Sequence, residues 1–196
     1  MQIDRRDLLA SLLALCAQPM ASRLALANGD LWAAIREGQA FILLRHALAP
    51  GTGDPPGFQL GDCSTQRNLS DDGRQQARRI GDLIRQNGVG EAAVHSSQWC
   101  RCLDTATALR LGKVEQQPLL NSFFGTPAEG RRQTENLRVW LLDGAARKAQ
   151  PALILVTHQV NITALTGLVP SSGELVFAGI SGDGTVSVLG RQSGPG

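Results

Sequence analysis

The strongest constraint on the fold of this 196-residue chain is a pair of apolar runs that each end in a histidine. Residues 41–46 read Phe-Ile-Leu-Leu-Arg-His, and residues 153–158 read Leu-Ile-Leu-Val-Thr-His. Continuous apolar runs of this length are typical of strands that are buried on both faces of a parallel sheet. In open α/β sheets, ligands bind beside the carboxyl ends of the strands. The pattern therefore predicts a buried sheet with His46 and His158 at its ligand-binding edge.

A third apolar stretch, from Ala92 to Ser97, leads within a few residues to Arg101. Arg45 directly precedes His46, so two arginines and two histidines lie near the ends of predicted strands. If these strands are neighbours, the four side chains form a cationic pocket that contains a nucleophile. The planar guanidinium fork matches the geometry of phosphate oxygens. The pocket is therefore expected to bind a phosphoryl group.

Strands alternate with helices along the chain. Strands are predicted at 40–44, 92–96, 114–116, 153–158, 174–178 and 185–189, and helices at 31–37, 71–86, 104–111, 135–148 and 161–168. Ser70 and Thr134 are the expected N-caps of the second and fourth helices. The alternation predicts a three-layer αβα domain with a mostly parallel central sheet, to which a C-terminal hairpin adds one antiparallel edge.

Two irregular segments are expected to shape the pocket. Residues 47–62 directly follow His46 and are rich in proline and glycine, which predicts a long loop that covers the ligand. Residues 120–132 form the second segment. The chain has no tyrosine and few other aromatic residues, which argues against a stacking surface for bases or sugars. The same composition is equally expected of a core rich in alanine, leucine and glycine.

Residues 1–27 have the layout of an export signal. Arg5 and Arg6 precede an apolar run at 8–17, and a small-x-small cleavage site lies at 25–27. The paired arginines resemble a twin-arginine signal; an ordinary signal peptide with two incidental arginines, or an amphipathic first helix, are the alternatives. Cleavage after Ala27 predicts a mature domain of residues 28–196 in the periplasm or outside the cell.

Four cysteines are present, and Cys16 lies within the predicted signal. In an oxidising compartment, Cys63, Cys100 and Cys102 predict one disulfide and one leftover thiol. A bridge from Cys63 to either of the other two would join two loops of the site. A structural role is favoured over a nucleophilic cysteine. The Cys-x-Cys spacing without a second pair is not that of a zinc site.

Charge and hydropathy limit the classes of partner. The formal net charge is +2, and no run of lysine and arginine forms a stripe that would bind nucleic acid. No apolar stretch reaches the roughly 20 residues of a membrane span, so no span is expected after removal of the signal. A small phosphorylated substrate is the expected partner, and the sequence leaves the oligomeric state open.

Four segments occur in an order that resembles the histidine phosphatase superfamily, which has the phosphoglycerate mutase-like fold. They are Leu-Arg-His-Ala at 44–47, the stretch 67–77 that begins Arg-Asn-Leu-Ser, the stretch 96–106 around Arg101, and Val-Thr-His at 156–158. Ala47 replaces the usual glycine of the first segment. The chain further resembles the small exported single-domain branch that includes the heptose phosphate phosphatase of the lipopolysaccharide core.

The resemblance implies a phosphatase that hydrolyses phosphomonoesters without a metal or cofactor. It assigns the nucleophile to His46, which would carry the phosphoryl group, and the binding of the phosphoryl oxygens to Arg45, Arg101 and His158. Arg67 occupies the arginine of the family's Arg-Pro-Leu-Ser/Thr motif, where it either adds a fourth cation or braces its loop. Ala47 and Gln159 are further expected substrate contacts, and His95 is expected to be structural.

The chain differs from the family's pattern at the positions where the general acid is expected. Asn121 and Ser122 stand where many members have a glutamate, and Gln159 stands where another branch has an aspartate. Glu129 is the tentative acid, with Asp54 as the next candidate. Either a displaced carboxylate donates the proton, or the substrate has a leaving group that needs none. The alternative function is a catalytically weak phosphate-binding protein that lacks the acid.

Overall fold

The computed structural model describes residues 28–144, 146 and 151–196. The strands in these ranges are β1 (Phe41–Arg45), β2 (Ala93–Ser96), β3 (Val114–Gln116), β4 (Leu153–Thr157), β5 (Leu175–Ile180) and β6 (Val186–Gln192). The α-helices are α1 (Asn28–Arg36), α2 (Asp71–Gln86), α3 (Cys100–Leu109), α4 (Gly130–Leu142) and α5 (Gln159–Thr166), and short 3-10 turns cover Cys63–Thr65, Pro118–Leu120 and Pro127–Glu129. The predicted signal peptide and residues 145 and 147–148 of the helix expected at 135–148 lie outside the described residues, and α4 ends at Leu142, earlier than expected.

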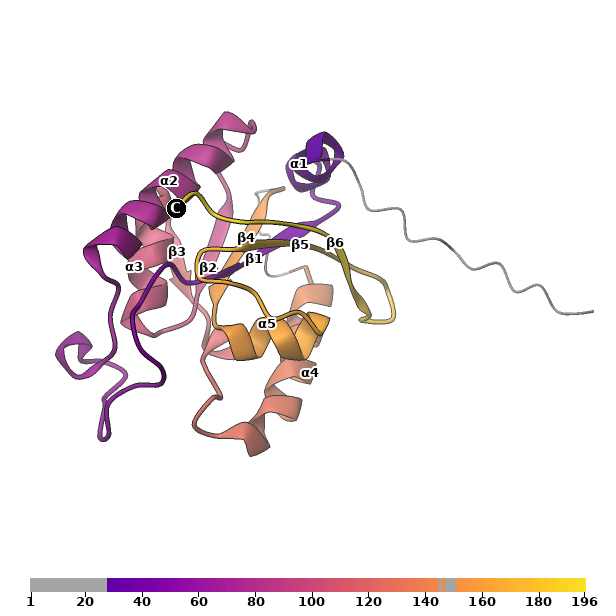
Figure 1. Cartoon of the computed structure of the whole chain (residues 1–196). Coiled ribbons are helices and arrows are strands. Elements are labelled where there is room, and N and C mark those ends of the chain that lie inside the picture. The colour runs from indigo at the N-terminus through magenta and orange to yellow at the C-terminus, as the bar shows by residue number, and fades with distance from the viewer. Residues whose placement is uncertain (1–27, 145, 147–150) are drawn as a thin grey trace, which may run out of the picture.

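The strands form one sheet in the order β3-β2-β4-β1-β5-β6 (Figure 1). The first four strands of this order run parallel, with Leu43 of β1 opposite Leu155 of β4. β5 pairs antiparallel with β1, and β6 pairs antiparallel with β5. The predicted mostly parallel sheet with one antiparallel edge is confirmed, and the edge consists of two strands.

Helices cover both faces of the sheet (Figure 1). Successive side chains of a strand point to opposite faces, so Ile42 and Leu44 of β1 pack with the core residues of α1, α2 and α3, whereas Phe41 and Leu43 pack with those of α4 and α5. All four side chains are fully buried. An unbroken apolar run is what a strand with two buried faces requires. This arrangement confirms the predicted three-layer αβα architecture.

Helix boundaries differ from the sequence predictions where tertiary contacts act on the first turn. α3 begins at Cys100 rather than at residue 104, and the amide of Cys100 donates to Oε1 of Gln66 at 3.0 Å. The capping group therefore comes from a distant loop. Thr134 is not an N-cap: it lies inside α4, where its Oγ1 donates to the carbonyl of Gly130 at 2.7 Å.

The start of α2 anchors the long loop that follows β1. Ser70 is the N-cap, as predicted, and its Oγ accepts from the amide of Gly73 at 3.0 Å. The amide of Ser70 also donates to the carbonyl of Leu48 at 3.1 Å. A Cβ on Gly73 would lie 2.0 Å from that same carbonyl oxygen. Only glycine allows the helix to approach the loop so closely, and this approach fixes the chain just beyond His46.

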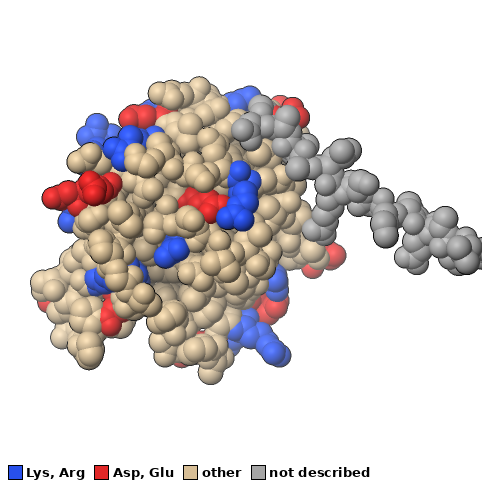
Figure 2. Space-filling model, in the orientation of Figure 1, with Lys and Arg blue, Asp and Glu red and all other residues tan. Residues whose placement is uncertain are grey.

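Charged side chains of both signs are intermixed on the face shown in Figure 2. Within the described residues that this view shows, neither sign of charge dominates the face. Among the helices that the structure describes, none combines the length and the apolar character needed to cross a membrane.

Candidate active site

A cavity of about 570 Å³ lies at the carboxyl edge of the parallel strands. β1 leads directly into His46, β4 into His158, and β2 into the turn that precedes Arg101 at the start of α3. Because β4 lies between β1 and β2, these three strand ends are adjacent. The lining residues are Arg45, His46, Gly51, Thr52, Gly53, Asp54, Phe58, Arg67, Trp99, Arg101, Ser122, Phe124, Gly125, Thr126, His158, Gln159 and Val160.

The imidazole of His46 is buried and held in one tautomer. Its Nδ1 lies 2.8 Å from the carbonyl oxygen of Ala47. Because a carbonyl can only accept, Nδ1 carries the proton and Nε2 keeps its lone pair. Burial lowers the pKa of His46 to about 3, and the charges of Arg101, Arg45 and Arg67 act in the same direction, against the opposing effect of the Ala47 hydrogen bond. His46 is therefore a neutral imidazole with a free ring nitrogen at physiological pH.

His158 lies opposite His46, with 5.5 Å between the ring centroids. Its Nδ1 is 3.4 Å from Nη2 of Arg101, which can only donate, so Nε2 carries the proton and donates to Oγ of Ser97 at 2.8 Å. The Ser97 hydroxyl in turn donates to Oδ1 of Asn121 at 3.3 Å. Burial lowers the pKa of His158 most, followed by the effect of His46 and then of the neighbouring arginines, and together they hold it well below its usual value.

Arg101 is buried beside Asp54, which fixes its orientation. Nη1 and Nη2 of Arg101 donate to the two carboxylate oxygens of Asp54 at 2.8 and 3.2 Å. Asp54 also accepts from Nε1 of Trp99 at 3.0 Å and from the amide of Arg67 at 3.1 Å. Burial disfavours the charge on Asp54, but these bonds and the charge of Arg101 hold its pKa below the usual value. Asp54 is therefore a fully hydrogen-bonded carboxylate near neutral pH.

The remaining guanidinium groups are partly held by main-chain carbonyls. Nη1 of Arg45 donates to the carbonyl of Pro170 at 2.8 Å. Nε of Arg67 donates to the carbonyl of Gly53 at 2.7 Å, and its Nη1 donates to that of Ala49. Arg67 therefore lines the cavity and braces the loop, so the two roles considered from the sequence are compatible. Within the described residues, Nε of Arg45 and Nε of Arg101 have no hydrogen-bond partner. Both nitrogens are buried away from solvent.

The structure brings seven of the sequence-predicted residues together and leaves two apart. Those that line the cavity are Arg45, His46, Asp54, Arg67, Arg101, His158 and Gln159. Ala47 is fully buried and does not line it, because its amide donates to Thr105 Oγ1 and its carbonyl holds His46. Glu129 is exposed and outside the lining, where its carboxylate accepts from Thr126 Oγ1 at 3.4 Å. The tentative assignment of Glu129 as the acid has no support in this geometry.

Sequence reasoning missed the aromatic part of the site. Phe58, Trp99 and Phe124 all line the cavity, and the rings of Phe58 and Trp99 lie 5.6 Å apart. The indole of Trp99 also stands edge-on to His158, with 5.4 Å between centroids. Three of the eight aromatic residues of the chain (five Phe, three Trp) therefore line the cavity, although the composition argued against a stacking surface. Their location in the two irregular segments and beside Arg101 was the available signal.

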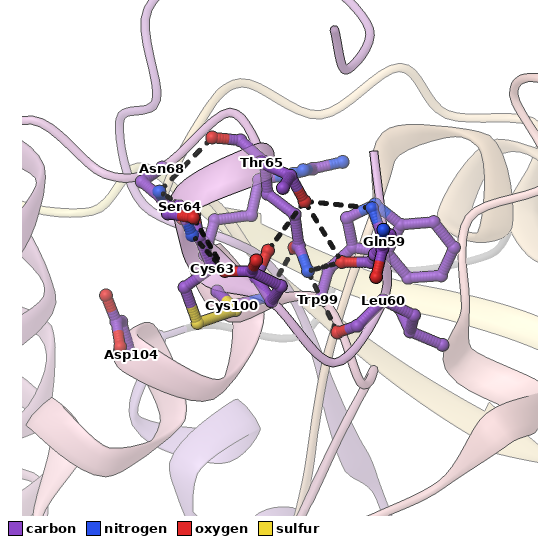
Figure 3. Close-up of a disulfide and its surroundings, with 12 residues drawn as sticks. Gln59, Leu60, Cys63, Ser64, Thr65, Asn68, Trp99, Cys100 and Asp104 are labelled. Atoms are coloured by element: carbon purple, nitrogen blue, oxygen red, sulfur yellow. Dashed lines mark hydrogen bonds between the residues drawn. A yellow bond between two sulfur atoms is a disulfide. The ribbon is translucent and has the colours of Figure 1, made fainter. Parts of the chain in front are cut away.

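A disulfide joins the loop after His46 to the helix that carries Arg101 (Figure 3). Cys63 is bonded to Cys100, which decides between the two pairings left open by the sequence. Gln66 reinforces this junction, because its Oε1 accepts from the amide of Cys100 while its Nε2 donates to the carbonyls of Gln59 and Leu60 within the loop. Cys102 is buried and unbonded, and burial raises the pKa of its thiol to about 12. The protonated thiol of Cys102 is not a nucleophile near neutral pH.

The sequence of this chain also matches a known protein family. The model of the histidine phosphatase superfamily, branch 1, matches residues 41–152, more than half of the chain. A comparison with curated proteins found no match.

Several solved structures share the fold at low sequence identity. The protein histidine phosphatase SixA complexed with tungstate has a TM-score of 0.57 at 13% identity, over 79% of this chain and 96% of that chain. The phosphoserine phosphatase mutant from Entamoeba histolytica in complex with phosphoserine has a TM-score of 0.55 at 15% identity, over 79% and 96%. The mycobacterial glucosyl-3-phosphoglycerate phosphatase with inorganic phosphate has a TM-score of 0.53 at 16% identity, over 81% and 97%.

Proposed function

The chain belongs to the histidine phosphatase superfamily, and from this premise we propose that it is an exported phosphatase that hydrolyses a small phosphomonoester through a phosphohistidine on His46. The observation that carries the proposal is the neutral imidazole of His46, with Nδ1 anchored to a carbonyl and Nε2 free. It lies in a cavity that three arginines also line. A nucleophile without charge, surrounded by fixed cations, suits attack on a phosphoryl dianion.

The proposed reaction has two displacements at phosphorus. In the first, Nε2 of His46 forms a bond to phosphorus as the bond to the leaving oxygen breaks. In the second, water attacks the phosphoryl group, the phosphorus–nitrogen bond breaks, and inorganic phosphate is released. Arg45, Arg101 and Arg67 neutralise the non-bridging oxygens throughout, and His158 lines the same cavity.

The leaving group is the step for which the site offers least help. Among the described residues, Asp54 is the one carboxylate that lines the cavity. Its two oxygens are engaged by Arg101, Trp99 and Arg67, and it is ionised, so it has no proton to donate. We therefore propose that the substrate has a leaving group that departs without a carboxylic acid.

Trapping of the intermediate tests the proposal. With ³²P-labelled substrate and a rapid acid-free quench, the label should appear on His46, and His46→Asn should abolish both labelling and turnover of 4-nitrophenyl phosphate. His95 is a matched control: it is a buried histidine whose Nε2 lies 2.6 Å from the carbonyl of Ala146, outside the cavity lining. His95→Asn should retain labelling. Label on His158 would overturn the assignment.

A second outcome of the same assays would favour the alternative function. If the protein binds vanadate and phosphate but turns over no activated aryl phosphate, it is a phosphate-binding protein that has lost catalysis. If the protein neither binds these anions nor turns over an aryl phosphate, the proposal that this cavity binds a phosphoryl group is wrong.

Export is part of the proposal and rests on residues 1–27 together with the Cys63–Cys100 disulfide, since disulfides persist in oxidising compartments. Expression of the full chain in a bacterium, followed by fractionation and mass spectrometry, should find a periplasmic product that begins at Asn28. Arg5→Lys together with Arg6→Lys should block export if the twin-arginine route is used and leave it intact if the general route is used. An unprocessed product in the cytoplasm would contradict export.

A further inference from the structure

The cavity is larger than the phosphoryl group that its cations would hold. Its volume of about 570 Å³ lies within the roughly 300–1,000 Å³ typical of pockets that bind organic ligands of drug size. The cations and histidines that suit the phosphoryl group are Arg45, His46, Arg67, Arg101 and His158. The rest of the lining therefore surrounds the group to which the phosphate is attached.

Three aromatic rings from separate segments dominate that remaining part. Phe58 comes from the long loop after β1, Trp99 from the turn before α3, and Phe124 from the segment between β3 and α4. Phe58 and Trp99 are in tilted contact, with an interplanar angle of 40°. A Cβ on Gly53 would lie 3.9 Å from Cε1 of Phe124, so the first loop and Phe124 meet across the cavity.

Two of these rings are partly exposed. Phe58 is 36% exposed and Phe124 is 58% exposed, although both line a cavity. Burying an aromatic face against another apolar group is favourable, and aromatic pairs gain further from offset or edge-on geometry. A flat apolar leaving group placed between them would cover surface that is otherwise in contact with water.

The polar groups of this part of the cavity suit a sugar less well. The Ser122 hydroxyl accepts from the amide of Phe124 at 3.3 Å, and the Thr126 hydroxyl donates to Glu129 at 3.4 Å. Asp54, the one carboxylate among the described lining residues, is occupied by donors from the protein. A buried sugar hydroxyl without a hydrogen-bond partner is unfavourable. Thr52 and Gln159 also line the cavity, so the case for an apolar group rests on the exposed rings of Phe58 and Phe124.

We propose that the leaving group of the substrate is aromatic and that Phe58, Trp99 and Phe124 select it. The inference rests on the proposed phosphatase function and agrees with the absence of an available acid. A phenol has a pKa of about 10, as in tyrosine, so a phenolate departs far more easily than the alkoxide of a sugar. Selection by contact and departure without an acid thus point to the same class of substrate, a small aryl phosphate.

The test separates ring contact from ease of departure by using two alkyl esters. Benzyl phosphate and glycerol 1-phosphate both release an alkoxide, but only benzyl phosphate carries a ring. The wild-type protein should prefer benzyl phosphate by about 10-fold in kcat/KM, and Phe124→Ala should reduce that ratio by about 5- to 10-fold. Phe58→Ala should act in the same direction. Val169→Ala is the matched control, because Val169 is 62% exposed and lies outside the cavity lining.

Inhibition by phosphonates measures binding and does not depend on turnover. Benzylphosphonate should inhibit more strongly than methylphosphonate, and Phe124→Ala should remove most of that difference while Val169→Ala keeps it. Circular dichroism establishes that each variant is folded. Equal inhibition by the two phosphonates, or a preference for glycerol 1-phosphate, would overturn the aromatic selection even if His46 is labelled as proposed. Loss of the proposed function would instead appear as no labelling of His46 with any substrate.

Discussion

Acid is expected to destabilise the protein through His46. Its pKa is about 3 in the folded protein, and an unfolded chain has the ordinary histidine value of about 6.5. Between these values the unfolded chain binds a proton that the folded protein does not. The free energy of unfolding therefore has its full value above about pH 7 and falls as the pH decreases toward 3.

The magnitude follows from the two pKa values. A shift of one pKa unit corresponds to about 1.4 kcal/mol, and between pH 7 and pH 5 the His46 contribution amounts to about 2 kcal/mol. His158 contributes in the same direction, because its pKa is also lowered by burial and by neighbouring cations. The burial and the neighbouring arginines that keep His46 neutral as a nucleophile thus lower the stability of the protein in acid.

Urea unfolding at pH 7 and at pH 5 measures the effect, with His46→Asn as the comparison. Asparagine does not titrate, so the variant should lose about 2 kcal/mol less than the wild-type protein between the two pH values. Titration of the imidazole signals by NMR provides an independent check. If both proteins lose the same free energy, or if His46 titrates near pH 6.5, the argument for a neutral buried nucleophile fails.

Three further variants test the surroundings of the site. Replacing both Cys63 and Cys100 by serine should lower the free energy of unfolding by about 4 kcal/mol in urea, from the loop entropy of a 37-residue separation, and an unchanged midpoint would contradict this. Asp54→Asn should reduce kcat for 4-nitrophenyl phosphate about 10- to 100-fold by releasing the orientation of Arg101, without weakening inhibition by inorganic phosphate. Glu129→Gln should keep kcat/KM within about twofold for aryl and alkyl phosphates, because this exposed side chain does not line the cavity, and a selective loss on alkyl phosphates would restore it as the acid.

The arrangement of the strand ends was accessible from the sequence. A strand buried on both faces must be apolar throughout, so the runs that end at His46 and His158 marked central strands of the sheet. The carboxyl ends of neighbouring parallel strands meet at one edge, which placed both histidines together with Arg45. The N-cap of α2 could also be predicted, because the side-chain oxygen of Ser70 can accept a hydrogen bond from an amide of the first turn.

Tertiary packing decided what depends on residues far apart in the chain. Gln66 supplies the partner for the first amide of α3, so the helix starts before its own sequence indicates. The fold of the two irregular segments turned Glu129 outward and placed Asp54 against Arg101. Spacing along the chain does not determine how far Glu129 lies from the cavity or Asp54 from Arg101. Loop conformation is set by contacts with the rest of the protein.

For the same reason, the residues expected to bind the phosphoryl group were easier to predict from the sequence than the residues around the leaving group. Arg45, His46 and His158 stand at strand ends, where periodicity locates them, and the order of the motifs locates Arg67 and Arg101. Phe58, Trp99 and Phe124 come from three segments, and their proximity exists only once the loops have packed across the cavity. The strand ends that carry His46 and His158 could thus be located from the sequence, whereas the contact between Phe58 and Trp99 depends on how the loops pack.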